Sequence, residues 1–249
     1  MRTTSFALLL IFSLSVRAET ITVAVASNFA GPMADLVEQF EQKTGHQVRS
    51  AAASTGMLFA AVTNGAKYSA LLAADEQRPR LLEERGLGVA GSRFTFAIGR
   101  LELWSADPGL AGADCRAQLE DLGPRRLAIA NPVTAPYGAA AKSFLQAAGL
   151  WEGVESRLVY GQNIAQTLQF VVTRNASLGL IAVAQADSGR LPEAACRWRV
   201  PASMHEPIIQ QAILLHPAAD NDVAVAFLEF LRSGDGKGII RSHGYEVPD

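Results

Sequence analysis

Residues 21–40 read ITVAVASNFAGPMADLVEQF, a stretch that predicts a strand, a short polar turn and a helix. Residues 21–26 are β-branched and mostly apolar, which is typical of a buried parallel strand. In residues 29–41 the apolar positions recur three and four apart, which puts one stripe on a helix: Met33, Leu36, Val37 and Phe40. This unit organises the rest of the chain.

The turn between this strand and helix, Ser27-Asn28, is a candidate anion site. In open α/β sheets, ligands bind where the carboxyl ends of strands meet the amino ends of helices. The unpaired N–H groups and the positive dipole end of a helix start favour an anion. The alternative is that Ser27 or Asn28 only caps its own helix. This stretch alone leaves both interpretations open.

The strand–turn–helix pattern returns along the chain. Short apolar runs lie at residues 48–53, 70–73, 94–98, 101–104, 127–130, 158–160, 178–184 and 208–215. Helical patterns lie at residues 57–64, 79–85, 139–148, 164–174 and 221–231. The alternation up to residue 184 predicts parallel sheets covered by helices. We expect two α/β halves, with the last strand and helix free to return to the first half.

The N-terminus has the features of a secretory signal. Arg2 provides the positive start, residues 6–16 are apolar, and Ala18 is a small residue suited to cleavage. The apolar run is shorter than the ~20 residues that a membrane span requires. We expect residues 1–18 to be a signal peptide and the remaining chain to be periplasmic, without direct membrane insertion.

Charge and cysteine content limit the partners and the compartment. Removal of residues 1–18 takes away Arg2 and Arg17, so the 22 Lys and Arg become 20 against 24 Asp and Glu, a net charge of −4. This mild acidity, without a basic cluster, argues against nucleic acid. Cys115 and Cys196 are permitted to form a disulfide in an oxidising compartment, and two buried free thiols are the alternative.

The sequence carries none of the common enzyme signatures. It contains no GxSxG, P-loop or HExxH motif. The four histidines lie far apart without the spacing of zinc ligands: His46, His205, His216 and His243. A hydrolase using Ser27 or Ser54 would need a matched histidine and acid, which the motifs do not supply. We expect no enzymatic activity and no cofactor.

Four polar turns at predicted helix starts remain as candidate binding residues: Ser27-Asn28, Ser54-Thr55-Gly56, Tyr137-Gly138 and Asn163-Ile164. None of them carries Lys, Arg or His, so a site built from them offers hydroxyl, side-chain amide and backbone N–H donors. Hydrogen bonds to a charged group contribute about 1.5–3 kcal/mol each. Such a site can hold a fully deprotonated dianion, and it disfavours ligands that must donate a proton.

These residues resemble the periplasmic molybdate-binding proteins of ABC transporters, the ModA family, over residues 20–249. The resemblance rests on motifs in order: VASNF at 25–29, ASTG at 53–56, AADE at 73–76, NP to PYG at 131–138 and LGLIA at 178–182. It implies a type II periplasmic binding protein, in which two α/β lobes of mostly parallel sheet flanked by helices close over a tetrahedral oxyanion. Lobe I would comprise residues 20–99 and 207–249, and lobe II residues 100–206.

Carried over by position, the resemblance implies oxyanion ligands in lobe I at Ser27 and the amide of Asn28. Thr55 stands at the second hydroxyl position, with Ser54 just before it as the competing candidate. Thr55 in place of the commoner serine adds a methyl group, which should reduce the volume of the pocket slightly.

In lobe II the resemblance implies ligands at Tyr137 and Ile164, through a backbone N–H or a tyrosine hydroxyl. Many family members have a tyrosine ligand in the strand around Ala182, where this chain has alanine. Tyr137 would then supply the missing phenol from another direction.

The implied function is capture of molybdate, and also of tungstate, by a monomer that delivers the oxyanion to an ABC permease. The metal would be bound only as the oxyanion, on the same residues. The alternative is a protein of the same fold that binds sulfate, thiosulfate or a small organic anion.

Overall fold

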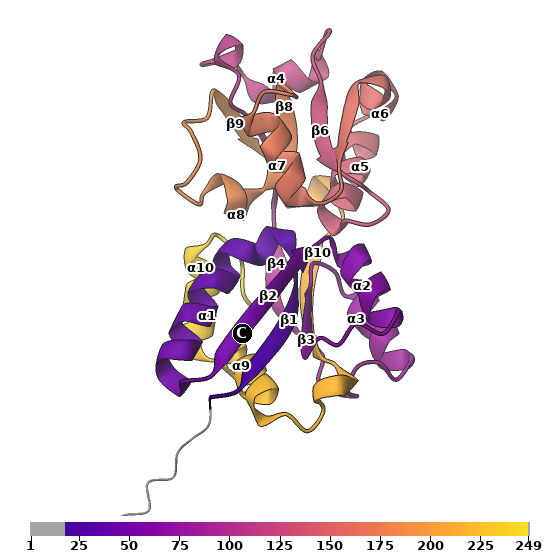
Figure 1. Ribbon diagram of the computed structural model, residues 1–249. Helices are drawn as coiled ribbons and strands as arrows, with labels where there is room; N and C mark the ends of the chain where they lie inside the picture. Colours follow the sequence, from indigo (N-terminus) through magenta and orange to yellow (C-terminus); the bar gives the residue numbers. More distant parts are fainter. Residues whose placement is uncertain (1–17, 249) are drawn as a thin grey trace, which may run out of the picture.

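The computed structural model describes residues 18–248, so residues 1–17 of the expected signal peptide lie outside the described part. Residues 18–248 form two lobes, each built on a five-stranded sheet, stacked one above the other (Figure 1). Within this range no helix combines the length and the apolar character needed to cross a bilayer.

Lobe I contains the sheet of strand order β2-β1-β3-β10-β4. Its strands are β1 (Thr20–Ala26), β2 (Gln47–Ala53), β3 (Ala70–Ala73), β4 (Phe94–Gly99) and β10 (Ile208–Leu214). Its helices are η1 (Ser27–Phe29), α1 (Ala30–Thr44), α2 (Thr55–Thr63), α3 (Gln77–Glu84), η5 (His216–Ala218), α9 (Asp222–Arg232) and α10 (Gly234–Ser242). Helices α1, α9 and α10 cover one face of the sheet, and α2 and α3 cover the other (Figure 1).

Lobe II contains the sheet of strand order β7-β6-β8-β5-β9. Its strands are β5 (Leu101–Ser105), β6 (Leu127–Ala130), β7 (Leu158–Gly161), β8 (Leu178–Ala182) and β9 (Cys196–Arg199). Its helices are η2 (Pro108–Leu110), α4 (Cys115–Glu120), α5 (Pro136–Ala147), α6 (Trp151–Val154), η3 (Glu155–Arg157), α7 (Ile164–Val172), α8 (Val183–Ala186) and η4 (Ala202–Met204).

Each sheet is mostly parallel, as predicted from the sequence, with one strand that runs against the other four. Strand β1 runs parallel to β2 and β3, and β6 runs parallel to β7 and β8, as the repeated strand–helix units require. Strand β10 is antiparallel to β3 and β4, and β5 is antiparallel to β8 and β9. The antiparallel strands adjoin the two passages between the lobes, so they join their sheets without the helical crossover that a parallel strand needs.

The chain passes between the lobes twice. The first passage is immediate, because β4 ends at Gly99 and β5 begins at Leu101. The second runs from β9 through η4 to β10. The short elements η2 and α4 lie between β5 and β6.

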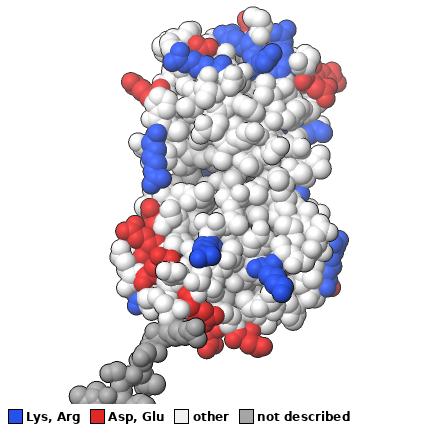
Figure 2. Space-filling model, viewed as in Figure 1, with Lys and Arg blue, Asp and Glu red and all other residues white. Residues whose placement is uncertain are grey.

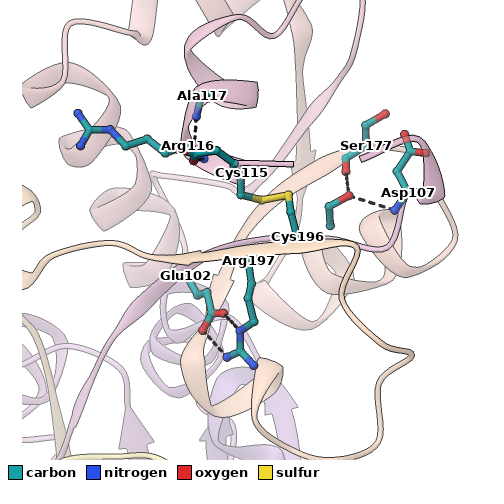
Figure 3. Close-up of a disulfide and its surroundings, with 10 residues drawn as sticks. Glu102, Asp107, Cys115, Arg116, Ala117, Ser177, Cys196 and Arg197 are labelled. Carbon is teal, nitrogen blue, oxygen red and sulfur yellow. Dashed lines mark hydrogen bonds and ion pairs between the residues drawn. A yellow bond between two sulfur atoms is a disulfide. The ribbon is translucent and has the colours of Figure 1, made fainter. Parts of the chain in front are cut away.

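Cys115 and Cys196 form a disulfide in lobe II, with their Cα atoms 5.3 Å apart (Figure 3). The bond joins the first residue of α4 to the first residue of β9, two segments 81 residues apart in sequence. On the next residue of β9, Arg197 forms an ion pair with the buried carboxylate of Glu102 (Figure 3). The disulfide therefore ties an edge strand and a short helix of lobe II to each other.

Replacement of Cys115 and Cys196 by serine should lower the free energy of unfolding by about 2–4 kcal/mol, because the bond restrains a long loop in the unfolded chain. Urea denaturation followed by circular dichroism measures the change. Wild-type protein treated with a reductant is the matched control and should lose a similar amount. Equal denaturation midpoints for the oxidised wild type and the double variant would contradict this stabilising role.

Candidate functional site

The four polar turns predicted as a site come together around one cavity between the lobes. Its lining includes the six residues proposed as oxyanion ligands, but not Gly56, Gly138 or Asn163 of the same turns. The lining residues are Ala26, Ser27, Asn28, Ala53, Ser54, Thr55, Ala74, Ala135, Pro136, Tyr137 and Ile164. Lobe I contributes the ends of β1 and β2 and the starts of η1 and α2, and lobe II contributes the starts of α5 and α7. The cavity thus lies at the carboxyl ends of parallel strands, as in other α/β folds.

The first turn presents Ser27 and Asn28 from the 3₁₀ helix η1, and both residues are buried. Neither side chain caps η1 or α1, so the alternative of a simple capping role is wrong. The side-chain Nδ2 of Asn28 donates to Gln210 Oε1 (2.8 Å) and to Tyr245 Oη (3.0 Å). Asn28 can therefore serve the cavity through its main-chain N–H, and Ser27 through its hydroxyl.

The second turn presents two buried hydroxyl groups, from Ser54 and Thr55. Ser54 precedes α2 as its N-cap residue but makes no side-chain capping bond. Its Oγ is buried and has no hydrogen-bond partner among the described residues. Thr55 Oγ1 accepts a hydrogen bond from the N–H of Ala74 (3.0 Å), which leaves its own proton free to be donated. Both hydroxyls border the cavity, and Ser54 is the one with no other partner.

The start of α5 presents Tyr137, which lines the cavity and whose phenol oxygen is buried without a hydrogen-bond partner among the described residues. Its Oη lies so close to Gly99 that a Cβ atom on this glycine would be 2.2 Å away. Burial raises the pKa of the Tyr137 phenol well above its ordinary value, and the neighbouring Tyr245 adds to the shift. Because Pro136 and Tyr137 are the first residues of α5, the main-chain N–H of Tyr137 has no acceptor within the helix. This N–H is the donor that Tyr137 can direct at the cavity.

Ile164 is the first residue of α7, and the residue before it caps the helix. Asn163 is the N-cap of α7, and its side chain accepts from the N–H of Gln166 (3.0 Å). Gln185 fastens this segment to β8, because its Nε2 donates to Ile164 O (3.2 Å) and its Oε1 accepts from Ala182 N–H (3.1 Å). The main-chain N–H of Ile164 is therefore held in place in the first turn of α7, where it has no helical acceptor.

A buried polar cluster supports the cavity from behind, at the passage between the lobes. Tyr245 Oη donates to the main-chain oxygen of Asn28 (2.9 Å) and accepts from its side chain, while Gln210 Oε1 accepts the other Asn28 proton. The phenol of Tyr137 enters this cluster from lobe II, beside Gly99. This cluster was not predicted from the sequence. Its one signal is the polar pair QQ at 210–211 inside an apolar strand, since buried polar side chains require partners.

Among residues 18–248, no Lys, Arg, His, Asp or Glu borders the cavity. On the face shown in Figure 2, the belt where the two lobes meet is also mostly uncharged, with acidic groups concentrated on lobe I. An anion in this cavity would be held by hydroxyl and N–H dipoles and by helix N-termini. A two-lobe α/β fold with a donor-lined cavity between its lobes defines a solute-binding protein.

Comparison with known proteins agrees with this class. The family of bacterial extracellular solute-binding proteins matches residues 21–246. The molybdate-binding protein ModA of Azotobacter vinelandii is 44% identical over 229 residues, covering 92% of this chain and 90% of the relative. ModA of Rhodobacter capsulatus is 39% identical over 245 residues, covering 97% and 94%. The structure of the periplasmic molybdate-binding protein of Azotobacter vinelandii superposes with a TM-score of 0.85 at 36% identity, covering 92% and 100%.

The chain therefore belongs to the bacterial extracellular solute-binding proteins and, within them, to the ModA family.

The Tyr245 phenol should give the protein a distinct alkaline sensitivity. Burial raises its pKa to about 12, against about 10 for an unfolded tyrosine. Between these values the unfolded state has lost the proton that the folded state keeps, so the free energy of unfolding falls as the pH rises. Replacement by phenylalanine removes up to ~1.4 kcal/mol per pH unit of that slope.

Urea denaturation at several pH values between 9 and 12 (roughly the range that spans both tyrosine pKa values) measures this slope. The free energy of unfolding of each protein is expressed relative to its own value at neutral pH. This subtraction removes the pH-independent cost of the hydrogen bonds to Asn28 that the variant lacks. Parallel curves for wild type and Tyr245→Phe would show that Tyr245 does not resist ionisation in the folded state.

Proposed function

We propose that this protein captures molybdate in the periplasm and delivers it to an ABC permease. The observation that carries the proposal is the interlobe cavity, whose donors are neutral and come from both lobes. The relatives named as molybdate-binding proteins support the identity of the ligand. Each lobe supplies only part of the donor set, so the anion stabilises the arrangement in which the lobes are together.

Neutral donors suffice to bind a dianion with useful affinity. A hydrogen bond to a charged group contributes about 1.5–3 kcal/mol, and micromolar to nanomolar binding corresponds to about 8–12 kcal/mol. The hydroxyls of Ser27, Ser54 and Thr55 and the N–H groups of Asn28, Tyr137 and Ile164 could make six such bonds, about 9–18 kcal/mol in all, which exceeds this requirement over most of the range. The surplus offsets the desolvation of the anion.

The same donor set favours a fully deprotonated tetrahedral oxyanion over a protonated one. The cavity has no carboxylate to accept the proton of an oxyanion such as hydrogen phosphate, and a hydroxyl that accepted this proton would still need another acceptor for its own. Size then separates the remaining dianions, because donors placed to reach the larger molybdate are too far apart for sulfate. We expect tungstate, which has nearly the size of molybdate, to bind as well.

Several further features complete the proposal. Residues 1–18 act as a signal peptide, and the mature chain is a periplasmic monomer that meets the membrane only through its permease. The protein binds its ligand without converting it. Ser27 and Ser54 are the nucleophiles that a hydrolase would use, and the cavity that they line includes no histidine or carboxylate to activate them.

Isothermal titration of the mature protein with molybdate, tungstate and sulfate at fixed salt tests this function. We expect submicromolar binding of molybdate and tungstate and no heat from sulfate. Sulfate binding as tight as molybdate binding would favour the alternative ligand class. If none of the three anions gives a heat of binding, the assignment to these oxyanions is overturned.

Ser27→Ala and Ser54→Ala should each weaken molybdate binding by about 10-fold or more, because each removes one hydrogen bond to the anion. The titration is repeated with both variants and with Ser188→Ala as a control. Ser188 is exposed in lobe II, and its replacement should leave the affinity unchanged. Wild-type affinity in both cavity variants would contradict the assigned donors.

A further inference from the structure

A loop of lobe II, residues 131–135, reaches across to lobe I beside the cavity. The loop is held rigidly by its own hydrogen bonds. Asn131 N–H donates to Gly161 O (2.8 Å), Asn131 Oδ1 accepts from Val133 N–H (2.9 Å), and Asn131 O accepts from Ala135 N–H (2.9 Å). The main-chain oxygens of Val133 and Thr134 remain as acceptors that point at the other lobe. Because the loop is rigid, a contact that holds the loop also holds lobe II in position.

Lobe I meets these two acceptors with two donors. The N–H of Gly56, in the first turn of α2, donates to Thr134 O (2.8 Å). Arg78 Nη2, from α3, donates to Val133 O (2.9 Å). The three parts are closely packed, because a Cβ atom on Gly56 would lie 2.8 Å from Thr134 O, 2.9 Å from Thr134 Cα and 3.2 Å from Arg78 Nη2. Only glycine allows this approach of the lobes at position 56.

Arg78 is fixed in place by Asp75, which precedes α3. Asp75 accepts from the Arg78 main-chain N–H at Oδ1 (2.8 Å) and from Nη1 at Oδ2 (2.5 Å). The two side chains are largely buried, with 20% and 18% of their surfaces exposed. The guanidinium is thereby oriented before it meets Val133, so less side-chain entropy is lost when the lobes come together.

The contact lies at the edge of the cavity. Gly56 follows Thr55 and Thr134 precedes Ala135, and both of these neighbours line the cavity. Separation of the lobes would break the two hydrogen bonds between them, although neither is made to the anion itself. The contact is thus placed to resist opening while a ligand is inside.

We propose that Gly56 and Arg78 form an interlobe clasp on Val133 and Thr134 that sets the rate at which the bound oxyanion is released. The proposal rests on the proposed function, because the clasp matters only if the cavity holds the ligand. Gly56 and Arg78 are positioning residues. They stabilise the closed arrangement, and the hydroxyl and N–H donors of the cavity bind the anion.

The matched comparison is Arg78→Gln against Arg80→Gln. Both changes remove one positive charge from α3, so any long-range effect on anion association is shared. Arg80 is 57% exposed and pairs with Glu84 (3.8 Å) on its own helix. Release is measured by loading the full mature protein with ⁹⁹Mo-labelled molybdate and adding excess unlabelled molybdate, with rapid filtration.

We expect Arg78→Gln to release molybdate about 5- to 20-fold faster, because the variant lacks a hydrogen bond from a charged group that exists only while the lobes are together. Its association rate should match that of Arg80→Gln, and Arg80→Gln should release molybdate at the wild-type rate. Wild-type release from Arg78→Gln, or equal acceleration in both variants, would overturn the clasp.

Gly56→Ala provides the second test and does not depend on the stability of the Arg78 variant. Alanine favours the helix of an isolated lobe, so the melting temperature of the unliganded protein should not fall. Molybdate release should nevertheless accelerate by at least as much as in Arg78→Gln, because the methyl group meets main-chain atoms of Thr134. Unchanged release from Gly56→Ala would contradict the proposal. Failure of the wild type to bind molybdate would instead overturn the proposed function, and the clasp with it.

Discussion

The structure depends on one constraint, the burial of polar donors at a cavity that offers them no charged partner. A buried hydroxyl without an acceptor costs about 1–3 kcal/mol. Ser54 Oγ is such a group, and it stands at the boundary between the lobes. A bound anion satisfies donors from both lobes at once. The free-energy cost of burying these donors without partners would therefore be offset only when the ligand is present and the lobes are together.

The two passages of the chain make this dependence possible. Strands β4 and β5 are separated by Arg100 alone, so the two lobes are joined directly at this passage. The polar cluster of Asn28, Gln210 and Tyr245 lies behind the cavity and fixes the first turn in lobe I. Tyr137 extends from lobe II into the same region. The turns that line the cavity and the passage between the lobes are thus parts of one packed unit.

Sequence reasoning could identify the strand–turn–helix units and the turns that line the cavity, because both depend on local patterns. It could not place side chains whose partners are distant in the chain. Asn28 bonds Gln210 across 182 residues, which removes its side-chain amide from the candidate donors. Likewise, local patterns did not predict that the phenol of Tyr137 packs beside Gly99. The antiparallel strands β5 and β10 were missed because strand direction depends on chain topology, which local periodicity does not encode.

The most direct test of the central claim is a crystal structure of the protein with molybdate, in which anomalous scattering locates the molybdenum atom. We expect one molybdenum site between the lobes. The molybdate oxygens should accept hydrogen bonds from the hydroxyls of lobe I and from the N–H groups at the starts of α5 and α7. We also expect that no Lys or Arg side chain contacts the anion. A molybdenum site outside this cavity, or a molybdate bonded to the Arg78 guanidinium, would contradict the assignment of this cavity and its neutral donors as the binding site.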